Sequence, residues 1–255
     1  MKGLDGKVAI VTGAGGAIGR AIARRLGEAG CAVGVFDKDL PAAQATVAEL
    51  ASHERRALAV RCDITDYAAV AAAVDECERK LGPTDVLVNN AGWDRAIDFL
   101  ATEPPFWEEL IAINLRGPLN VHHVVLRRMA ERKRGRVVNI SSDAGRVGSS
   151  GESVYAACKG GVIALTKTLA RELASTGITL NVVCPGPTET PLLASFLGEG
   201  ERGQKIYEGL KRSIPMKRLG QPDDVAGAVA FFASDESAFM TGQVVSVSGG
   251  LTMHG

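Results

Sequence analysis

The sequence predicts an α/β fold in which a doubly wound, mostly parallel sheet of seven strands carries helices on both faces. Seven short apolar runs, most of them rich in Val and Ile, alternate along the chain with segments of helical pattern. Continuous apolar runs are typical of strands buried on both faces of a parallel sheet. Strands that alternate with helices predict βαβ units with right-handed crossovers.

The elements follow one another without an internal repeat or a dividing linker, so we expect a single domain over 1–255. The expected strands lie at 8–12, 32–36, 57–61, 86–89, 135–141, 179–184 and 244–247. The expected helices lie at 17–30, 40–52, 66–81, 103–115, 117–133, 153–175 and 222–234. One irregular stretch, about 186–215, is Pro-rich and then Gly- and charge-rich. A long insertion of this kind is usually a lid or substrate loop, and a solvated surface loop is the alternative.

The composition of the chain argues against several classes of function. The chain has 255 residues with 29 basic and 29 acidic side chains, and this balance gives no electrostatic footprint for nucleic acid or an acidic membrane. No apolar run approaches the ~20 residues of a membrane span, and no apolar signal segment opens the chain. The five cysteines are scattered without a Cys-x-x-Cys pair, which favours reduced thiols and no metal site. We therefore expect a cytoplasmic protein; the cysteines are Cys31, Cys62, Cys77, Cys158 and Cys184.

A glycine-rich turn follows the first strand and leads into the first helix. It comprises Gly13, Gly15 and Gly19, with Ala17 and Ile18 between the last two. Such a turn lets the backbone approach a pyrophosphate, and the helix N-terminus supplies amide donors. Its place at the first strand-to-helix turn makes it a Rossmann dinucleotide site.

The second strand ends at Asp37, eighteen residues after Gly19. An acid there can accept hydrogen bonds from both ribose hydroxyls of the adenosine half and repels a 2′-phosphate. The sequence therefore predicts NAD over NADP, with Lys38 as a neighbour that softens the discrimination.

Tyr155 and Lys159 lie four residues apart in an expected helix and so share one face. A free phenol titrates near ~10, and an adjacent cation lowers that pKa. A tyrosine tuned in this way can take a proton from an alcohol or return one to a carbonyl. Cys158, between them, is interpreted as a packing residue.

Taken together, these residues resemble the short-chain dehydrogenase/reductase family over essentially the whole chain. The resemblance implies a catalytic set of Asn114, Ser142, Tyr155 and Lys159. In this set Asn114 would hold a water. Ser141 fits the family's spacing to Tyr155 less well than Ser142 does. It implies homotetramers. Ala17 stands where the family usually has a second glycine. Further cofactor contacts implied by the resemblance are Asp63, Ile64, Asn90, Ala91, Gly92, Pro185, Gly186, Thr188 and Thr190.

Other stretches resemble dehydrogenases of alicyclic hydroxyacyl-CoA thioesters, which implies 2-hydroxycyclohexane-1-carboxyl-CoA as the substrate. Substrate-facing positions would then be Trp93, Asp94, Arg146 and Glu152. Trp93 either offers a flat apolar wall to a ring or packs on the domain, and Arg146 either meets a CoA phosphate or is a surface residue. Lys205, Lys211 and Arg212 are further possible CoA contacts. His122 and His123 are interpreted as packing or surface residues.

Two alternatives stay open. The same catalytic set would serve a 3-oxoacyl reductase acting on an acyl carrier protein or CoA, although Asp37 favours NAD and biosynthetic reductases more often use NADPH. A non-catalytic NAD-binding sensor is the third reading, and the intact catalytic set argues against it.

Overall fold

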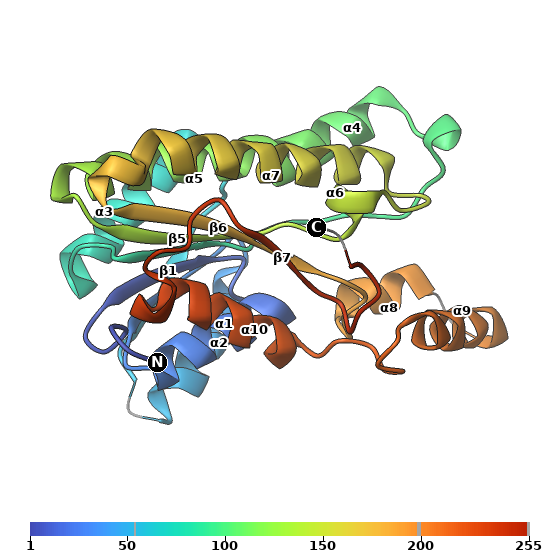
Figure 1. Ribbon diagram of the computed structural model, residues 1–255, viewed down its shortest axis with the longest axis horizontal. Coiled ribbons are helices and arrows are strands. Elements are labelled where there is room, and N and C mark those ends of the chain that lie inside the picture. Colours follow the sequence, from blue (N-terminus) through green and yellow to red (C-terminus); the bar gives the residue numbers. More distant parts are fainter. Residues whose placement is uncertain (54, 198–199, 254–255) are drawn as a thin grey trace.

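The computed structural model describes residues 1–53, 55–197 and 200–253, built around a seven-stranded sheet (Figure 1). The strand order is β3-β2-β1-β4-β5-β6-β7, and all six ladders are parallel. The predicted sheet is confirmed, and it is wholly rather than mostly parallel. The strands are β1 (Val8–Thr12), β2 (Ala32–Asp37), β3 (Ala57–Arg61), β4 (Val86–Asn89), β5 (Gly135–Ile140), β6 (Ile178–Pro185) and β7 (Val244–Val247).

Helices cover both faces of the sheet, as Figure 1 shows. One face carries α1 (Ala17–Glu28), α2 (Leu40–Ala51) and α10 (Pro222–Ala233). The other carries α3 (Tyr67–Leu81), α5 (Gly117–Arg132) and α7 (Ser153–Leu173). Further helical segments include α4 (Pro104–Ile111), α6 (Ala144–Val147) and the short turns η1 (Phe99–Ala101), η3 (Ala174–Thr176) and η4 (Asp235–Ser237).

The alternation of side chains along β1 explains its unbroken apolar sequence. Ala9 and Val11 pack into the core on the α1 and α10 face. Ile10, between them, packs into the opposite core with α3 and α5. Because successive strand residues point to opposite faces, a strand covered on both sides must be apolar throughout.

Two sequence expectations about helices are wrong. The expected helix at 103–115 stops at Ile111, and a π-helical turn, η2 (Ala112–Arg116), joins it to α5. The expected irregular stretch at 186–215 is mainly helical, with α8 (Pro191–Leu197) and α9 (Gly200–Ser213). Pro191 stands at the start of α8, where a missing amide proton costs nothing, so the Pro-rich start of this stretch begins a helix.

Within residues 1–53, 55–197 and 200–253, no helix is both long and apolar enough to cross a bilayer.

Candidate active site

One large cavity of about 1270 Å³ opens at the carboxyl ends of the strands. This is where ligands bind in open parallel sheets. It is lined by the glycine turn after β1, the loops after β2 to β6, the start of α7, and residues of α8, α9 and the C-terminal segment.

The glycine turn has little room for side chains. Gly13 has φ of +63°, and a Cβ there would lie 2.7 Å from the Cα of Ala91. A Cβ on Gly19 would lie 2.3 Å from the carbonyl oxygen of Gly13. No side chain caps the start of α1, where Ala17 and Ile18 line the cavity. Uncapped first-turn amides are suited to an anion such as a pyrophosphate, so the residues present fit a dinucleotide.

Gly15 differs from the expectation that it contacts the cofactor. It does not line the cavity. Its amide instead donates to Oδ2 of Asp37 at 2.9 Å, and a Cβ on Gly15 would lie 2.7 Å from that of Ala42. The tight turn therefore serves Asp37, whose Oδ1 also accepts from the Asp39 amide at 3.0 Å.

Asp37, Asp63 and Ile64 line the cavity together at the ends of β2 and β3. The amide and hydroxyl of Thr65 both donate to Asp63 Oδ1, at 2.9 and 2.8 Å. These two bonds hold the pKa of Asp63 below its usual value. The carboxylate of Asp63 therefore stays charged at neutral pH, which suits hydrogen-bond donors such as ribose hydroxyls or an adenine amino group.

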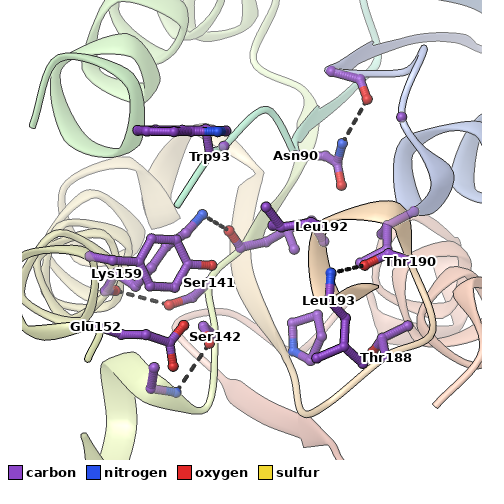
Figure 2. A pocket seen from close by; sticks show the side chains of 18 of the residues that line it. Asn90, Trp93, Ser141, Ser142, Glu152, Lys159, Thr188, Thr190, Leu192 and Leu193 are labelled. Atoms are coloured by element: carbon purple, nitrogen blue, oxygen red, sulfur yellow. Dashed lines mark hydrogen bonds between the residues drawn. The ribbon is translucent and has the colours of Figure 1, made fainter. Parts of the chain in front are cut away.

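The loop after β4 is tied to the glycine turn. Asn90 Nδ2 donates to the carbonyl of Thr12 at 2.9 Å and to that of Gly13 at 3.1 Å. Figure 2 shows Asn90 with one of these bonds. Asn90, Ala91 and Gly92 all line the cavity. A Cβ on Gly92 would lie 3.2 Å from Nζ of Lys159, so this glycine leaves space for the lysine.

Ser142, Tyr155 and Lys159 meet at the cavity, as the sequence predicts. Lys159 is only 3% exposed, its Nζ donates to the carbonyl of Ile140 at 3.0 Å, and it stands 5.4 Å from the centroid of the Tyr155 ring. The neighbouring Ser141 hydroxyl donates to the carbonyl of Lys159 at 2.9 Å. Its proton is therefore committed, which leaves Ser142 as the serine suited to a substrate oxygen.

The pKa of Tyr155 moves in the opposite direction from the expectation. Burial raises the pKa of this phenol, and the negative charges of Glu152 and Asp94 raise it further. The hydroxyl of Ser142 lies near enough to favour the phenolate and lowers the pKa in part. Lys159 does not overcome these effects, because burial lowers its own pKa to about 8 and its amine sits over the ring. The protein alone thus keeps Tyr155 protonated at neutral pH.

Asn114 lies in the π-helical turn and is fully buried. Its Nδ2 donates to the carbonyl of Trp93 at 2.7 Å and to that of Leu110 at 3.1 Å, and its Oδ1 accepts from the Trp93 amide at 3.2 Å. The side chain of Asn114 therefore fixes the loop that carries Trp93. Its role in holding a water stays a prediction.

The four predicted substrate positions divide into two pairs. Trp93 and Glu152 line the cavity, whereas Asp94 and Arg146 do not. Asp94 belongs to the loop after β4, and only 2% of it is exposed. Arg146 turns away because Nη1 donates to Ser246 at 2.7 Å, and Ser246 donates to Asp143. Arg146 therefore braces β7 against the loop after β5 and is in no position to bind a CoA phosphate within this cavity.

Several further residues singled out in the sequence lie away from the cavity. Lys205, Lys211 and Arg212 do not line the cavity. His122 is buried against the Pro118 carbonyl at 2.7 Å, and His123 contacts the hydroxyl of Tyr67 at 2.8 Å. The five cysteines are buried thiols. Within the described residues, no group of His, Cys, Asp and Glu could hold a metal ion.

The loop after β6 reaches the cavity as expected, through Pro185, Gly186, Thr188 and Thr190. Thr190 Oγ1 accepts from the amide of Leu193 at 3.1 Å at the start of α8 (Figure 2).

Sequence reasoning missed an apolar wall on this side of the cavity. It consists of Leu192, Leu193, Ile206, Leu210 and Leu251. The spacing of Ile206 and Leu210, one helical turn apart, is the signal that could have revealed it.

Comparisons with known proteins agree with this geometry. A family model described as "Enoyl-(Acyl carrier protein) reductase" matches residues 13–252. The chain is 39% identical over 248 residues to Nodulation protein G of Azospirillum brasilense, covering 96% of this chain and 98% of that protein. It is 38% identical over 251 residues to the (2S)-[(R)-hydroxy(phenyl)methyl]succinyl-CoA dehydrogenase subunit BbsD of Thauera aromatica, covering 98% of each.

Two further comparisons concern reductases. The chain is 37% identical over 249 residues to the 3-oxoacyl-[acyl-carrier-protein] reductase FabG of Escherichia coli, covering 98% of each. The crystal structure of levodione reductase matches with a TM-score of 0.92 at 32% identity, covering 96% of this chain and 97% of that one. With the dinucleotide turn, Ser142, Tyr155 and Lys159 on one cavity, the chain belongs to the short-chain dehydrogenase/reductase family of oxidoreductases, which act on CH–OH and keto groups with NAD or NADP.

Proposed function

We propose that the protein is an NAD-dependent dehydrogenase that interconverts 2-hydroxycyclohexane-1-carboxyl-CoA and 2-oxocyclohexane-1-carboxyl-CoA. The observation that carries the ring substrate is the position of Trp93. Its indole forms a wall of the cavity on the side facing Lys159 (Figure 2), and Asn114 holds its backbone at both ends. A flat aromatic wall buries an alicyclic ring better than a linear chain.

Three sources support the acyl-CoA part of the proposal. Several stretches around the site resemble 2-hydroxycyclohexanecarboxyl-CoA dehydrogenase, among them Arg146–Glu152 and the tail after Ser248. The name of the Thauera aromatica relative gives it as a subunit of a dehydrogenase for a hydroxylated succinyl-CoA thioester. The cavity of about 1270 Å³ is larger than the ~300–1,000 Å³ usual for small-ligand pockets, so it has room for a cofactor and a substrate together.

Cofactor binding would use the residues that line the long side of the cavity. The α1 amides would take the pyrophosphate, Asp37 the adenosine ribose, and Asp63 and Ile64 the adenine. The loop after β6 would meet the nicotinamide end, where Lys159 would bind the ribose. Bound there, NAD supplies the hydride acceptor. Asp37 carries the preference for NAD, because its carboxylate repels a 2′-phosphate.

In alcohol oxidation, Tyr155 takes the hydroxyl proton as general base; in ketone reduction it returns that proton. Ser142 donates to the substrate oxygen, where negative charge develops as the hydride moves. The loop carbonyl of Ile140 holds the Lys159 amine at 3.0 Å, so the amine is fixed beside the phenol before substrate arrives. Asn114 completes a water path to solvent and keeps Trp93 in place.

A 3-oxoacyl reductase is the second candidate, and the 37% identity to FabG favours it. It would use the same catalytic residues on a linear substrate. We further propose a homotetramer in the cytoplasm, consistent with the family, and a single domain over 1–255.

The test is NADH formation by the purified protein from 2-hydroxycyclohexane-1-carboxyl-CoA beside 3-hydroxybutyryl-CoA. We expect kcat/KM of ~10⁴ M⁻¹s⁻¹ or more for the ring substrate, well above the linear one. A preference for the linear substrate moves the protein to 3-hydroxyacyl dehydrogenation. Repeating the assay with NADP tests Asp37, since a preference for NADP would contradict that assignment. No turnover with any pairing would favour a non-catalytic nucleotide-binding protein.

A further inference from the structure

Two carboxyl groups meet beside the catalytic residues without an evident role in hydride or proton transfer. Glu152 precedes α7 by one residue, lines the cavity, and lies on the same side as Ser142 in Figure 2. Asp94 follows Trp93, is 2% exposed, and neither of its carboxyl oxygens accepts a well-formed hydrogen bond from the described residues. Both carboxyl groups act electrostatically on Tyr155.

A buried carboxylate without donors is costly unless it keeps a proton or finds a cation. The groups around Asp94 are Glu152 before α7, Tyr155, Cys158 and Lys159 on α7, and the adjacent Arg95. Arg95 offers its amide, while its guanidinium stacks 5.1 Å from the Phe106 ring centroid. Burial and then Glu152 raise the pKa of Asp94 to about 7, with Lys159 and the Arg95 amide opposing them.

Asp94 therefore holds a proton below about pH 7 and loses it above. Glu152 acts as a negative charge on both Asp94 and the phenol of Tyr155. This charge raises the pKa of Tyr155, which makes alcohol oxidation harder at neutral pH. A negative charge at this place disfavours the Tyr155 phenolate that acts as the base in alcohol oxidation. The two carboxyl groups are therefore expected to serve another purpose.

Resting on the proposed function, we infer that Asp94 and Glu152 form a charge filter for the substrate. The pair repels hydroxy and oxo acids whose carboxyl group is free and admits their neutral thioesters and esters. In 2-hydroxycyclohexane-1-carboxyl compounds the carboxyl carbon is two bonds from the reacting ring carbon, so a free carboxylate must enter the same end of the cavity as Glu152. Like charges a few ångströms apart in a partly desolvated site reduce binding by about 10- to 100-fold.

The filter can be measured by binding alone, because an alcohol and a reduced cofactor form a complex that cannot react. The probes are ethyl 2-hydroxycyclohexane-1-carboxylate and the free 2-hydroxycyclohexane-1-carboxylate, added to the protein saturated with NADH. Cofactor fluorescence reports each Kd at pH 6 and pH 8. For the wild type we expect the acid to bind at least 10-fold more weakly than the ester at pH 8. The difference should be smaller at pH 6, where Asp94 is protonated.

Four variants separate charge from shape. Glu152→Gln should reduce the acid-to-ester Kd ratio about 10-fold, whereas Glu152→Asp, which keeps the charge, should retain most of it. Asp94→Asn leaves only the charge of Glu152, so its ratio should be close to the wild-type ratio at pH 6 and should not change between pH 6 and pH 8. Glu109→Gln is the matched control, since Glu109 is exposed and lines the same cavity from α4. It should leave the ratio unchanged.

The charge filter is overturned if Glu152→Gln leaves the acid-to-ester Kd ratio at the wild-type value, or if Glu109→Gln changes this ratio as much as Glu152→Gln does. It is also overturned if the wild type binds the acid and the ester equally, or binds neither of them. Thermal unfolding of each variant shows that it is folded. The proposed substrate fails separately, if the ring thioester is not oxidised while the Kd ratio still responds to Glu152.

Discussion

The side chain of Asn114 holds the peptide of Trp93 at both ends, donating to its carbonyl at 2.7 Å and accepting from its amide at 3.2 Å. The π-helical turn that carries Asn114 places it, fully buried, against the loop after β4. Asn114 therefore ties the cavity wall formed by Trp93 to this turn. Inserted turns of this kind often occur at functional sites.

Replacement of Asn114 with Ala should loosen that unit. The variant leaves the buried polar groups of Trp93 without partners, which costs about 1–3 kcal/mol for each group. We expect kcat/KM to fall about 10- to 100-fold because the wall beside the reacting carbon loses its position. Urea denaturation and steady-state kinetics measure the two effects.

Asn181→Ala is the matched control for Asn114→Ala. Asn181 is equally buried, donates to the carbonyl of Met240 at 2.9 Å and accepts from the amide of Gln243 at 3.0 Å. It should lose comparable stability but keep kcat/KM per folded molecule. Equal losses of activity in both variants would mean that Asn114 acts only through overall stability.

Removing the hydroxyl of Tyr155 should abolish turnover. Tyr155→Phe keeps the ring that packs 5.4 Å from the Lys159 amine, so we expect NADH to bind with nearly unchanged Kd. Fluorescence titration of NADH and a sensitive turnover assay measure these properties. Activity above a few per cent of wild type would remove Tyr155 from the role of general acid and base.

The pH dependence of alcohol oxidation should follow from the raised pKa of Tyr155. Burial and the charges of Glu152 and Asp94 raise it, so the phenolate required as base becomes more abundant as pH increases. We expect kcat/KM for oxidation to rise by about tenfold per pH unit from pH 6 upward, and ketone reduction to stay nearly level over the same range.

Glu152→Gln removes one of the charges that raise the Tyr155 pKa, so its oxidation profile should shift to lower pH. An oxidation rate that is already level below pH 7 in the wild type would show that the bound cofactor and Lys159 outweigh burial.

The sheet and most of the site could be predicted from sequence because they depend on local patterns. Strands such as β1 are predicted by unbroken apolar runs. The Gly13–Gly19 turn and the Tyr155–Lys159 spacing each involve residues that are close in sequence, so they too can be recognised without the fold. The direction of the Tyr155 pKa could not be predicted, because it depends on burial and on Asp94, which is distant in sequence. The contact of Arg146 with Ser246 could not be predicted for the same reason, because Ser246 lies on β7, 100 residues away.

Trp93 should control the preference for a ring. Trp93→Leu removes the flat wall while keeping an apolar side chain, so we expect KM for the ring thioester to rise about 10-fold and KM for 3-hydroxybutyryl-CoA to change little. Trp107→Leu serves as the control, because Trp107 stacks on Phe99 at 5.5 Å and does not line the cavity. An equal effect of Trp93→Leu on both substrates would leave the ring preference without a structural basis.

Asp94 should make the protein less stable as pH rises. Its pKa is raised from 3.8 to about 7, so between these values the folded chain binds a proton that the unfolded chain releases. By linkage, the free energy of unfolding falls as pH increases through this interval. Asp94→Asn removes the charge, and the variant should be more stable than wild type at pH 8, with the advantage shrinking toward pH 5.

Asp63→Asn should behave in the opposite way, because the hydrogen bonds from Thr65 lower the pKa of Asp63. Its carboxylate contributes stability that is present above the unfolded pKa and is lost as pH falls through the folded one. Urea denaturation of both variants without cofactor at pH 5 and pH 8 makes the comparison. If Asp94→Asn is destabilised at pH 8, then Asp94 is a paired and stabilising carboxylate, and the argument that burial and Glu152 raise its pKa fails.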